Sequence, residues 1–281
     1  MSEEMKRYHE YHAEAHVFGG SFEHPLPQEV GSQAYVKLHK NGGYGAQRSS
    51  GFRLENVCSF RSAYTQVSGN PDPKPGHGWT TLVTAVIEGL NVLDVVTADR
   101  IVAQISTEHP LEGYVPKVTY LGTRYENFCI AGDPICVDLD LNFFGGKPAD
   151  DMPYTRHPKF LENVAKHCDA VHGRGNLPAK LAGRYNQIPR DKENVERVEC
   201  SLVNKIDGVR AGSVYGNVID VPDFGLIHLA GVSLMQSNFL PGAGIPQQTT
   251  IQMTMVEIQM GCIAGGKVTA SDTIINGHTK P

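Results

Sequence analysis

Strand-forming segments dominate the first half of this 281-residue chain and constrain its fold more than any other feature. Residues 52–67, 80–87 and 92–105 mix β-branched, aromatic and polar side chains, with a Gly-Leu-Asn turn at 89–91. Branched and aromatic side chains favour extended backbone, whereas Gly and Asn favour the turns between strands. The pattern predicts a β-meander in this part of the chain.

Residues 136–143 alternate strictly between apolar and polar types. Because successive side chains of a strand point to opposite faces, one face of this predicted strand carries Val137, Leu139, Leu141 and Phe143. The other face carries Asp138, Asp140 and Asn142. Three oxygen ligands in a row could hold calcium, but Phe143 stands where an EF-hand loop needs Gly, so an ordinary solvent face is favoured.

A turn sequence, Ala-Gly-Asp-Pro at residues 131–134, precedes that strand. We therefore expect residues 125–130 and 135–143 to form an antiparallel hairpin. Cys129 and Cys136 would then lie opposite one another, either as thiols or as a strained disulfide. The six cysteines include no Cys-x-x-Cys pair, and no export signal is evident, so free thiols are favoured.

The sequence period changes to that of a helix after residue 153. Pro158 stands at a first helical position, and Gly173 stands where a helix would stop. Between them, an apolar stripe follows helical spacing: Phe160, Val164, Cys168 and Val171. A shorter helix is expected at 178–186, with an apolar side formed by Leu181 and Tyr185. The two together predict a helical insert at residues 156–187.

Strand patterns resume after the insert, at residues 197–203, 214–221, 225–234 and 249–260. In the last segment the alternation of Ile251, Met253 and Met255 changes phase to Val256, Ile258 and Met260, which predicts a bulge near Met255. These strands are too few to enclose a core of their own. We expect them to join the first set in one antiparallel, sandwich-like β domain over residues 1–281, with two domains as the lesser alternative.

Composition excludes some classes of function. The net charge is −5, from 25 Lys and Arg against 30 Asp and Glu, which leaves no basic surplus for binding nucleic acid. No run approaches 18 apolar residues, and the first ten residues lack the apolar core of a signal peptide. We therefore expect a cytoplasmic protein that neither spans a membrane nor binds nucleic acid.

The densest group of functional side chains lies near the N-terminus. If residues 8–18 form a strand, Tyr11, Ala13, Ala15 and Val17 point inward. The outer face then carries Glu10 with three possible ligands of a divalent metal: His12, Glu14 and His16. On a helix, His9, His12 and His16 would line up instead. The spacing does not fit the His-Glu-x-x-His zinc motif, and a solvated polar face is the competing interpretation.

A second group of histidines accompanies the predicted helix: His157, His167 and His172, together with Cys168. Such a set raises the possibility of zinc or of a thiol nucleophile. Cys168 belongs to the apolar stripe, whereas His167 and His172 are expected off the stripe near the helix C-terminus, where the helix dipole favours a cation. No nucleophile elbow, Walker loop or dinucleotide fingerprint is present.

Two stretches carry a family resemblance: Val-Val-Thr-Ala-Asp-Arg-Ile-Val-Ala-Gln-Ile at 95–105, and residues 118–134, which end in Ile-Ala-Gly-Asp-Pro. A Val-x-Ala-rich strand followed by such a turn resembles uncharacterised bacterial β-domain proteins of the "choice-of-anchor" type. The resemblance implies a β architecture and a structural role, and it implies no catalytic residues. We expect the chain to differ from the surface-protein members of this group in lacking a signal peptide and an anchor segment.

Two hypotheses about function follow from the sequence. The first is a non-enzymatic β protein with a structural, self-assembly or partner-binding role, present as a homo-oligomer that pairs through β edges. The second is a metal-dependent enzyme that uses His12, Glu14 and His16. The catalytic residues of such an enzyme are not identified, and the possible divalent metal is the only cofactor that either hypothesis includes.

Overall fold

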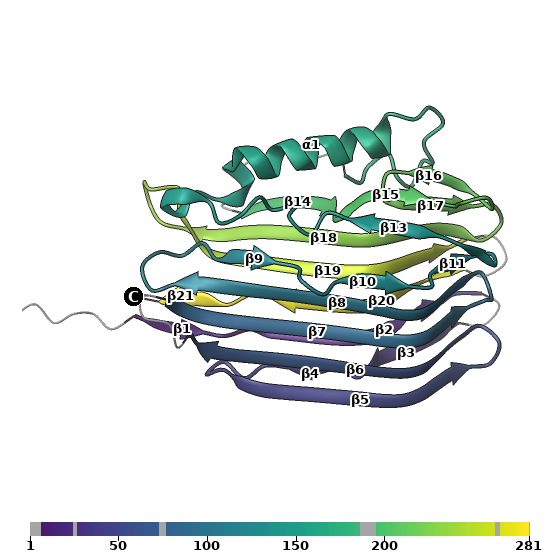
Figure 1. Cartoon of the computed structure of the whole chain (residues 1–281), viewed down its shortest axis with the longest axis horizontal. Helices are drawn as coiled ribbons and strands as arrows, with labels where there is room; N and C mark the ends of the chain where they lie inside the picture. The colour runs from purple at the N-terminus through teal and green to yellow at the C-terminus, as the bar shows by residue number, and fades with distance from the viewer. Residues whose placement is uncertain (1–6, 25–26, 73–76, 186–194, 262–264, 281) are drawn as a thin grey trace, which may run out of the picture.

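Long strands with alternating buried and exposed residues build this fold. The computed structural model describes residues 7–24, 27–72, 77–185, 195–261 and 265–280. Two antiparallel sheets pack through their apolar faces, and the α-helix α1 lies along one side of the pair (Figure 1). The fold is mainly β and sandwich-like, as the strand patterns predicted.

The larger sheet, sheet A, contains 11 described strands with the central order β16-β17-β18-β19-β20-β2-β3. Strand β2 pairs with β20 and strand β1 pairs with β21, so the first and last described strands share this sheet. Its strands are β1 (Tyr8–Glu10), β2 (Ala13–Phe22), β3 (Gln28–Gln33), β4 (Val36–Lys37), β14 (Val195–Ser201), β16 (Ser213–Tyr215), β17 (Val218–Val221), β18 (Gly225–Phe239), β19 (Pro246–Met260), β20 (Gly266–Ile275) and β21 (His278–Lys280).

The smaller sheet, sheet B, contains eight described strands. The predicted meander is present in it as β6, β7 and β8, but the expected turn at 89–91 is wrong, because these residues belong to β7 and the turn lies at 93–95. Four long consecutive strands pair in sequence order, from β5 through β6 and β7 to β8. Its strands are β5 (Gly43–Leu54), β6 (Cys58–Pro71), β7 (His77–Val92), β8 (Val96–Pro110), β9 (Lys117–Thr119), β10 (Arg124–Glu126), β11 (Cys129–Ile130) and β12 (Asp133–Pro134). A separate pair is formed by β13 (Cys136–Leu139) and β15 (Val203–Asp207).

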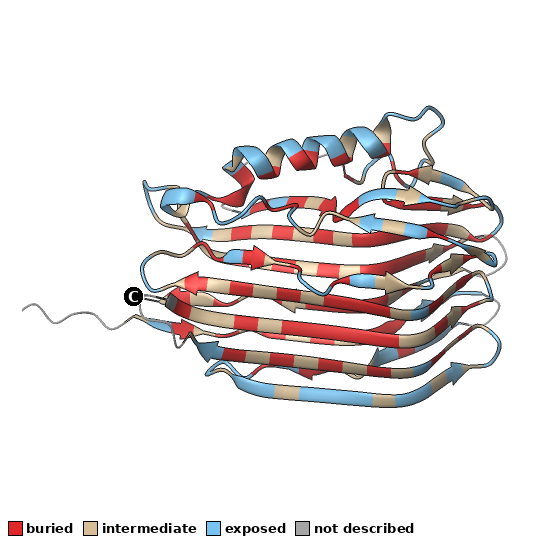
Figure 2. Cartoon of the chain, viewed as in Figure 1, coloured by how far each residue is buried: buried red, intermediate tan, exposed pale blue. Residues whose placement is uncertain are grey.

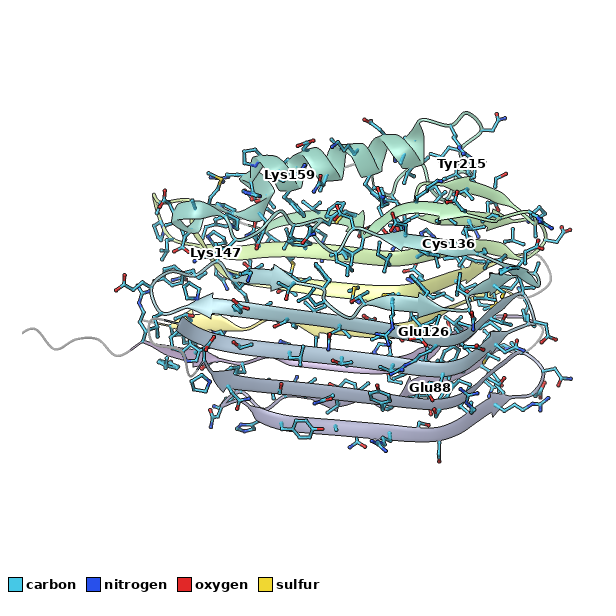
Figure 3. The ribbon with its side chains drawn as sticks, in the orientation of Figure 1. Glu88, Glu126, Cys136, Lys147, Lys159 and Tyr215 are labelled. Atoms are coloured by element: carbon cyan, nitrogen blue, oxygen red, sulfur yellow. The ribbon has the colours of Figure 1, made fainter. Side chains whose placement is uncertain are left out.

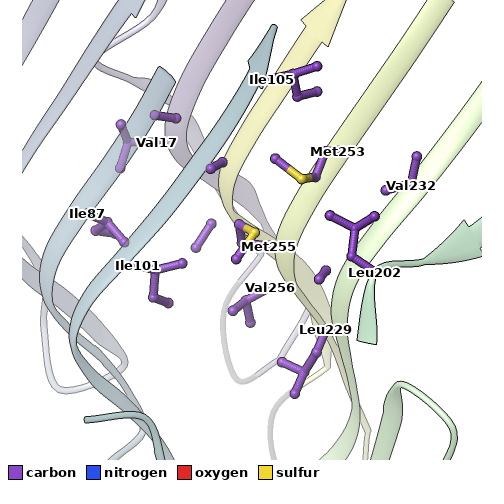
Figure 4. Close-up of a cluster of buried hydrophobic side chains, with 14 of the residues drawn as sticks. Val17, Ile87, Ile101, Ile105, Leu202, Leu229, Val232, Met253, Met255 and Val256 are labelled. Carbon is purple, nitrogen blue, oxygen red and sulfur yellow. The ribbon is translucent and has the colours of Figure 1, made fainter. Parts of the chain in front are cut away.

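The core lies between the two sheets. One continuous cluster of buried side chains joins strands of both sheets, and the alternation of buried and half-buried residues along each strand follows from the two faces of a sheet (Figure 2). Ile87 and Ile101 of sheet B belong to the same cluster as Met253 and Met255 of sheet A (Figure 4). These four side chains are 0% exposed, so the core is closed to water at its centre.

The predicted irregularity at Met255 is present, but it extends across sheet A. At one level, Val17, Ala230, Met255 and Ser271 each lack a partner in the ladder, while the residues on either side of them are paired. Because each strand has one such residue, no strand carries an extra residue, and the irregularity differs from a bulge. Ala230 and Ser271 take the left-handed conformation, with φ of 43° and 54°.

Tyr125 of sheet B stabilises this interruption. Its hydroxyl donates a hydrogen bond to the Met255 carbonyl oxygen at 2.6 Å and accepts one from the Ala230 backbone N–H at 2.9 Å. The interruption frees these two backbone groups inside the protein, where an unpaired polar group is costly. A side chain from the opposite sheet therefore supplies the hydrogen bonds that the ladder lacks at this point.

The expected hairpin of residues 125–143 is wrong in its register. Strand β11 pairs with β12, and Cys129 faces Pro134. Cys136 begins β13, where it faces Asp207 of β15 (Figure 3). The strand ends at Leu139 and a turn follows, so the predicted strand to Phe143 is too long. The chain turns back after only two residues on each side, because Asp133 and Pro134 belong to the ladder as well as to the turn. Both cysteines are free.

The predicted helix is confirmed as α1 (Pro158–His172), with Pro158 in the first turn. Phe160, Val164 and Val171 are buried against the body, and two short 3₁₀ turns, Ala149–Asp151 and Tyr154–Arg156, precede the helix. The helix at 178–186 is wrong. The described residues 178–185 form isolated turns, although Leu181 and Tyr185 are buried as an apolar pair. Among the described residues, no helix is both long enough and apolar enough to cross a bilayer.

Candidate functional site

The N-terminal segment packs on the body of its own chain. Tyr11, Ala13, Ala15 and Val17 are buried, as the alternation predicted. Strand β2 lies between β20 on one side and the short strands β3 and β4 on the other. Because these four residues face the core, the alternate residues of the segment lie on the outer face of sheet A.

The structure places the predicted ligands His12, Glu14 and His16 on that outer face, half-buried. Glu14 is already engaged: its Oε1 atom lies 2.7 Å from both His12 Nε2 and Lys37 Nζ, and its Oε2 atom accepts a hydrogen bond from Tyr35 at 2.9 Å. Burial opposes its ionisation, but these hydrogen bonds lower its pKa to about 2. Glu14 is therefore held as a carboxylate by groups of the protein.

His16 is held apart from this pair. Its Nε2 atom lies 3.9 Å from Asp272 Oδ2 on the neighbouring strand β20. Within the described ranges, no three His, Cys, Asp or Glu side chains are arranged to hold a metal ion. The metal hypothesis for His12, Glu14 and His16 stays a prediction, which metal analysis of the purified protein would test.

Asp272 connects this polar row to the rest of the outer face. It is 6% exposed, burial raises its pKa, and its two oxygens accept hydrogen bonds from Gln252 Nε2 at 3.1 and 3.3 Å. Gln252 belongs to β19 and lines a pocket beyond it. The polar row of β2 therefore continues across β20 and β19 into that pocket.

The pocket has a volume of about 220 Å³ and lies on the outer face of sheet A. Its floor consists of β14, β18, β19 and β20, and the residues Arg184 and Tyr185, which follow α1, form a wall. We call it the Arg184 pocket. Charged residues of its lining are Arg184, Arg197, Glu199, Glu257 and Lys267.

An ion-pair network organises the Arg184 pocket. The guanidinium of Arg184 donates two hydrogen bonds to the carboxylate of Glu257, at 2.6 and 3.2 Å, and a third to Glu199 at 3.3 Å. Lys267 lies 3.2 Å from Glu257, which also accepts a hydrogen bond from Gln259. Although burial of Glu257 opposes ionisation, the hydrogen bonds and positive charge of Arg184 lower its pKa to about 2. Both partners are therefore charged.

A second chain of hydrogen bonds joins the pocket to α1. His228 Nδ1 lies 3.2 Å from the Tyr185 hydroxyl, which accepts a hydrogen bond from Asn217. Asn217 Oδ1 in turn lies 2.9 Å from His167 of α1. Burial lowers the pKa of both histidines to about 4, so both rings are neutral near pH 7.

The expectation that His167 lies off the helix stripe, where the dipole favours a cation, is wrong. Its side chain is 5% exposed and faces the body of the protein. The buried face of α1 is wider than its apolar residues indicate, because it also includes the polar side chain of His167. This side chain contacts Asn217 in the interior. His172 lies at the helix end and its Nε2 atom donates to the Arg184 carbonyl oxygen at 3.1 Å, while the Cys168 thiol donates to the Tyr185 carbonyl oxygen.

A second candidate site is the edge of sheet B that is formed by strand β5. Strand β5 spans 12 residues, and it pairs with β6 from Gly43 to Leu54, with one interruption at Gly51. No described strand pairs with its other side. Most of its residues are exposed, including Tyr44 at 68% (Figure 2). The free side of β5 therefore offers a row of backbone donors and acceptors to a further strand.

Comparison with known proteins gives one match. A family model described as "Domain of unknown function (DUF8256)" matches residues 9–235. This range includes β5, α1 and Arg184, and it ends inside β18, before Glu257. No curated protein and no solved structure matches the chain. The resemblance to "choice-of-anchor" proteins stays a prediction.

Proposed function

The chain belongs to the DUF8256 family, and we propose that it is a non-enzymatic β protein that self-associates through the free side of strand β5. The observation that carries this proposal is the length of β5 together with its single partner, β6. Unpaired strand edges are templates for pairing with another chain, and proteins that stay monomeric usually shorten, cover or charge them.

The other sheet edges differ from β5. The edge strands of sheet A are β14 with 7 residues, β3 with 6, β1 and β16 with 3 each, and β4 with 2. The far edge of sheet B consists of β9 and β10, with 3 residues each, and β12, with 2. Among the described strands that lie at the edge of a sheet, β5 is therefore the longest, with 12 residues. It contains no Pro, and its only charged residues are Arg48 and Arg53.

A second copy of the chain is the partner that we propose for β5. Two identical antiparallel strands related by a two-fold axis form a closed dimer, and closed two-fold dimers are the commonest homo-oligomers. With the axis at Ser49, in the regular part of β5, Arg48 of one copy faces Ser50 of the other. No like charges are then opposite, so the pairing avoids the main electrostatic penalty between strands.

Proline substitution at two adjacent positions tests this proposal. In an antiparallel strand, successive N–H groups point to opposite sides. Of the variants Ser49→Pro and Ser50→Pro, one removes an N–H that bonds β6, and the other removes an N–H on the free side. We expect light scattering after size exclusion to show a dimer for the natural chain. The free-side variant should be a monomer with a nearly unchanged melting temperature, whereas the β6-side variant should melt lower.

A third proline variant, measured in the same way, is the control. Asn70→Pro, in the part of β6 that extends beyond β5, changes a strand end without touching the proposed interface and should leave the dimer intact. A natural chain that elutes as a monomer at all accessible concentrations would contradict the proposal. So would two proline variants of β5 that both remain dimers.

A further inference from the structure

We propose that the Arg184 pocket binds a small hydroxylated carboxylate, such as a hydroxy acid or a sugar acid. This site is separate from β5, and its occupation does not depend on self-association. A volume of about 220 Å³ is below the range of sites for drug-sized molecules, so the ligand is a small metabolite.

The charge of the lining selects an anion. Three cations, Arg184, Arg197 and Lys267, face two carboxylates, Glu199 and Glu257, so the pocket has an excess of one positive charge (3 − 2 = +1). His228, which also lines it, is neutral near pH 7 because burial lowers its pKa to about 4. A single negative charge on the ligand would balance this excess.

The cations have separate roles. The guanidinium of Arg184 donates its hydrogen bonds to Glu257 and Glu199, and these contacts hold Arg184 in place as part of the wall. Arg197 makes one described contact, with the Met235 sulfur at 3.8 Å, and Lys267 contacts Glu257 at 3.2 Å. The guanidinium of Arg197 therefore retains donors for a ligand. Its planar fork matches a carboxylate, and the ammonium of Lys267 adds a second positive charge.

His228 adds a neutral ring to the lining. Its Nδ1 atom lies 3.4 Å from the Arg184 guanidinium, which can only donate, so Nδ1 is the acceptor and the neutral ring carries its proton on Nε2. That Nε2 atom is buried, so it is closed to the solvent of the pocket. His228 therefore helps to hold Arg184 in place and adds no charge to the pocket.

Hydroxyl and amide groups line the remainder of the floor: Ser233, Thr254 and Gln252. These groups both donate and accept, as recognition of ligand hydroxyls requires. An aliphatic acid would leave them without partners, and a neutral polyol would leave the positive charge unbalanced. The combination therefore favours a ligand that carries both a carboxylate and hydroxyl groups.

Calorimetric titration of the whole chain with three probes tests the assignment. Gluconate carries the charge and the hydroxyls, sorbitol carries only hydroxyls, and hexanoate carries only the charge. Because charge-assisted hydrogen bonds and unpaired polar groups each have a substantial effect, we expect gluconate to bind at least about tenfold more tightly than either of the other two.

Two variants locate the binding. Arg197→Gln and Lys267→Gln change exposed cations of the pocket and should each weaken gluconate binding about tenfold or more. The matched control is Lys205→Gln, on the exposed strand β15, which should leave binding unchanged. If gluconate does not bind, or if Arg197→Gln binds it as well as the natural chain does, the proposal is wrong. The Arg184 network then serves only to attach residues 178–185 to sheet A.

Discussion

Tyr125 is the single residue on which the irregular part of sheet A depends most directly. Its hydroxyl bridges the Met255 carbonyl oxygen and the Ala230 N–H, so Tyr125→Phe leaves two buried backbone groups without a partner. We expect a loss of about 2 kcal/mol in the free energy of unfolding, measured by denaturant titration. Tyr35→Phe, whose hydroxyl contacts Glu14 at the surface, should lose much less. Equal effects of the two substitutions would show that the bridge is unimportant.

The residues of the Arg184 pocket could not be predicted from the sequence. Arg184 and His228 are separated by 44 positions, and Arg184 and Glu257 by 73, so no local spacing relates them. By contrast, the row of His12, Glu14 and His16 follows from a period of two within one strand, and its placement on the outer face was correct. What the sequence did not reveal is that Lys37 and Tyr35 engage Glu14. Short periodic patterns place side chains on a face, whereas contacts between distant strands decide their partners.

The position of strand β2 indicates that the chain needs its N-terminal segment in order to fold. It lies inside sheet A, between β20 and β3, so its removal would expose the core. We expect deletion of residues 1–18 to abolish cooperative thermal unfolding. A point variant makes the same test: Ala15→Asp places a charge at a site that is 2% exposed, whereas His12→Asp adds the same side chain on the outer face. Only Ala15→Asp should unfold the chain, as circular dichroism would show. A stable, folded deletion product would mean that β2 is dispensable.

Helices and strands were predicted correctly where the alternation of apolar and polar residues kept one period over many residues. Strands β6 to β8 of the meander and the helix α1 follow from long, regular patterns, whereas β5, which is rich in Gly and polar residues, was not predicted. The short hairpin at β11 and β12 was placed wrongly, because two residues on each side of a turn are too few to fix a register. The helix expected at 178–186 failed for a different reason: Leu181 and Tyr185 are buried by contacts with the sheet, and such contacts require no helix.

The whole molecule contains several buried, neutral histidines, and these set its stability in acid. Burial lowers the pKa of His9, His167 and His228 to about 4, and it also lowers the pKa of His109. His9 stacks on Trp79 and lies 4.4 Å from His109 between ring centroids. In the unfolded chain each ring has a pKa near 6.5 and binds a proton that the folded chain excludes. Stability is therefore complete above pH about 6.5 and is lost as the pH falls towards 4.

For His9, His167 and His228 the expected loss is on the order of 3 kcal/mol each at pH 4, since a shift of one pKa unit corresponds to about 1.4 kcal/mol. Melting temperatures measured between pH 7 and 4 should fall steeply across this window. The variant His167→Gln, which lacks one of these groups, should show a shallower fall. A melting temperature that stays constant to pH 4.5 and drops only below it would assign acid sensitivity to carboxylates such as Glu14 and Glu257, whose pKa values are lowered to about 2.

The arrangement of the molecule as a whole leaves one long strand edge open, and the central claim is that a second copy pairs with it. Hydrogen exchange at the backbone amides of β5, residues 43–54, is the most direct test, because on each side of Gly51 every second amide faces β6 and the others face the free side. If copies pair through β5, amides on both sides should be protected at high protein concentration, and those on the free side should exchange faster on dilution. Fast exchange of the free-side amides at every concentration, with protection only of those that face β6, would contradict the account.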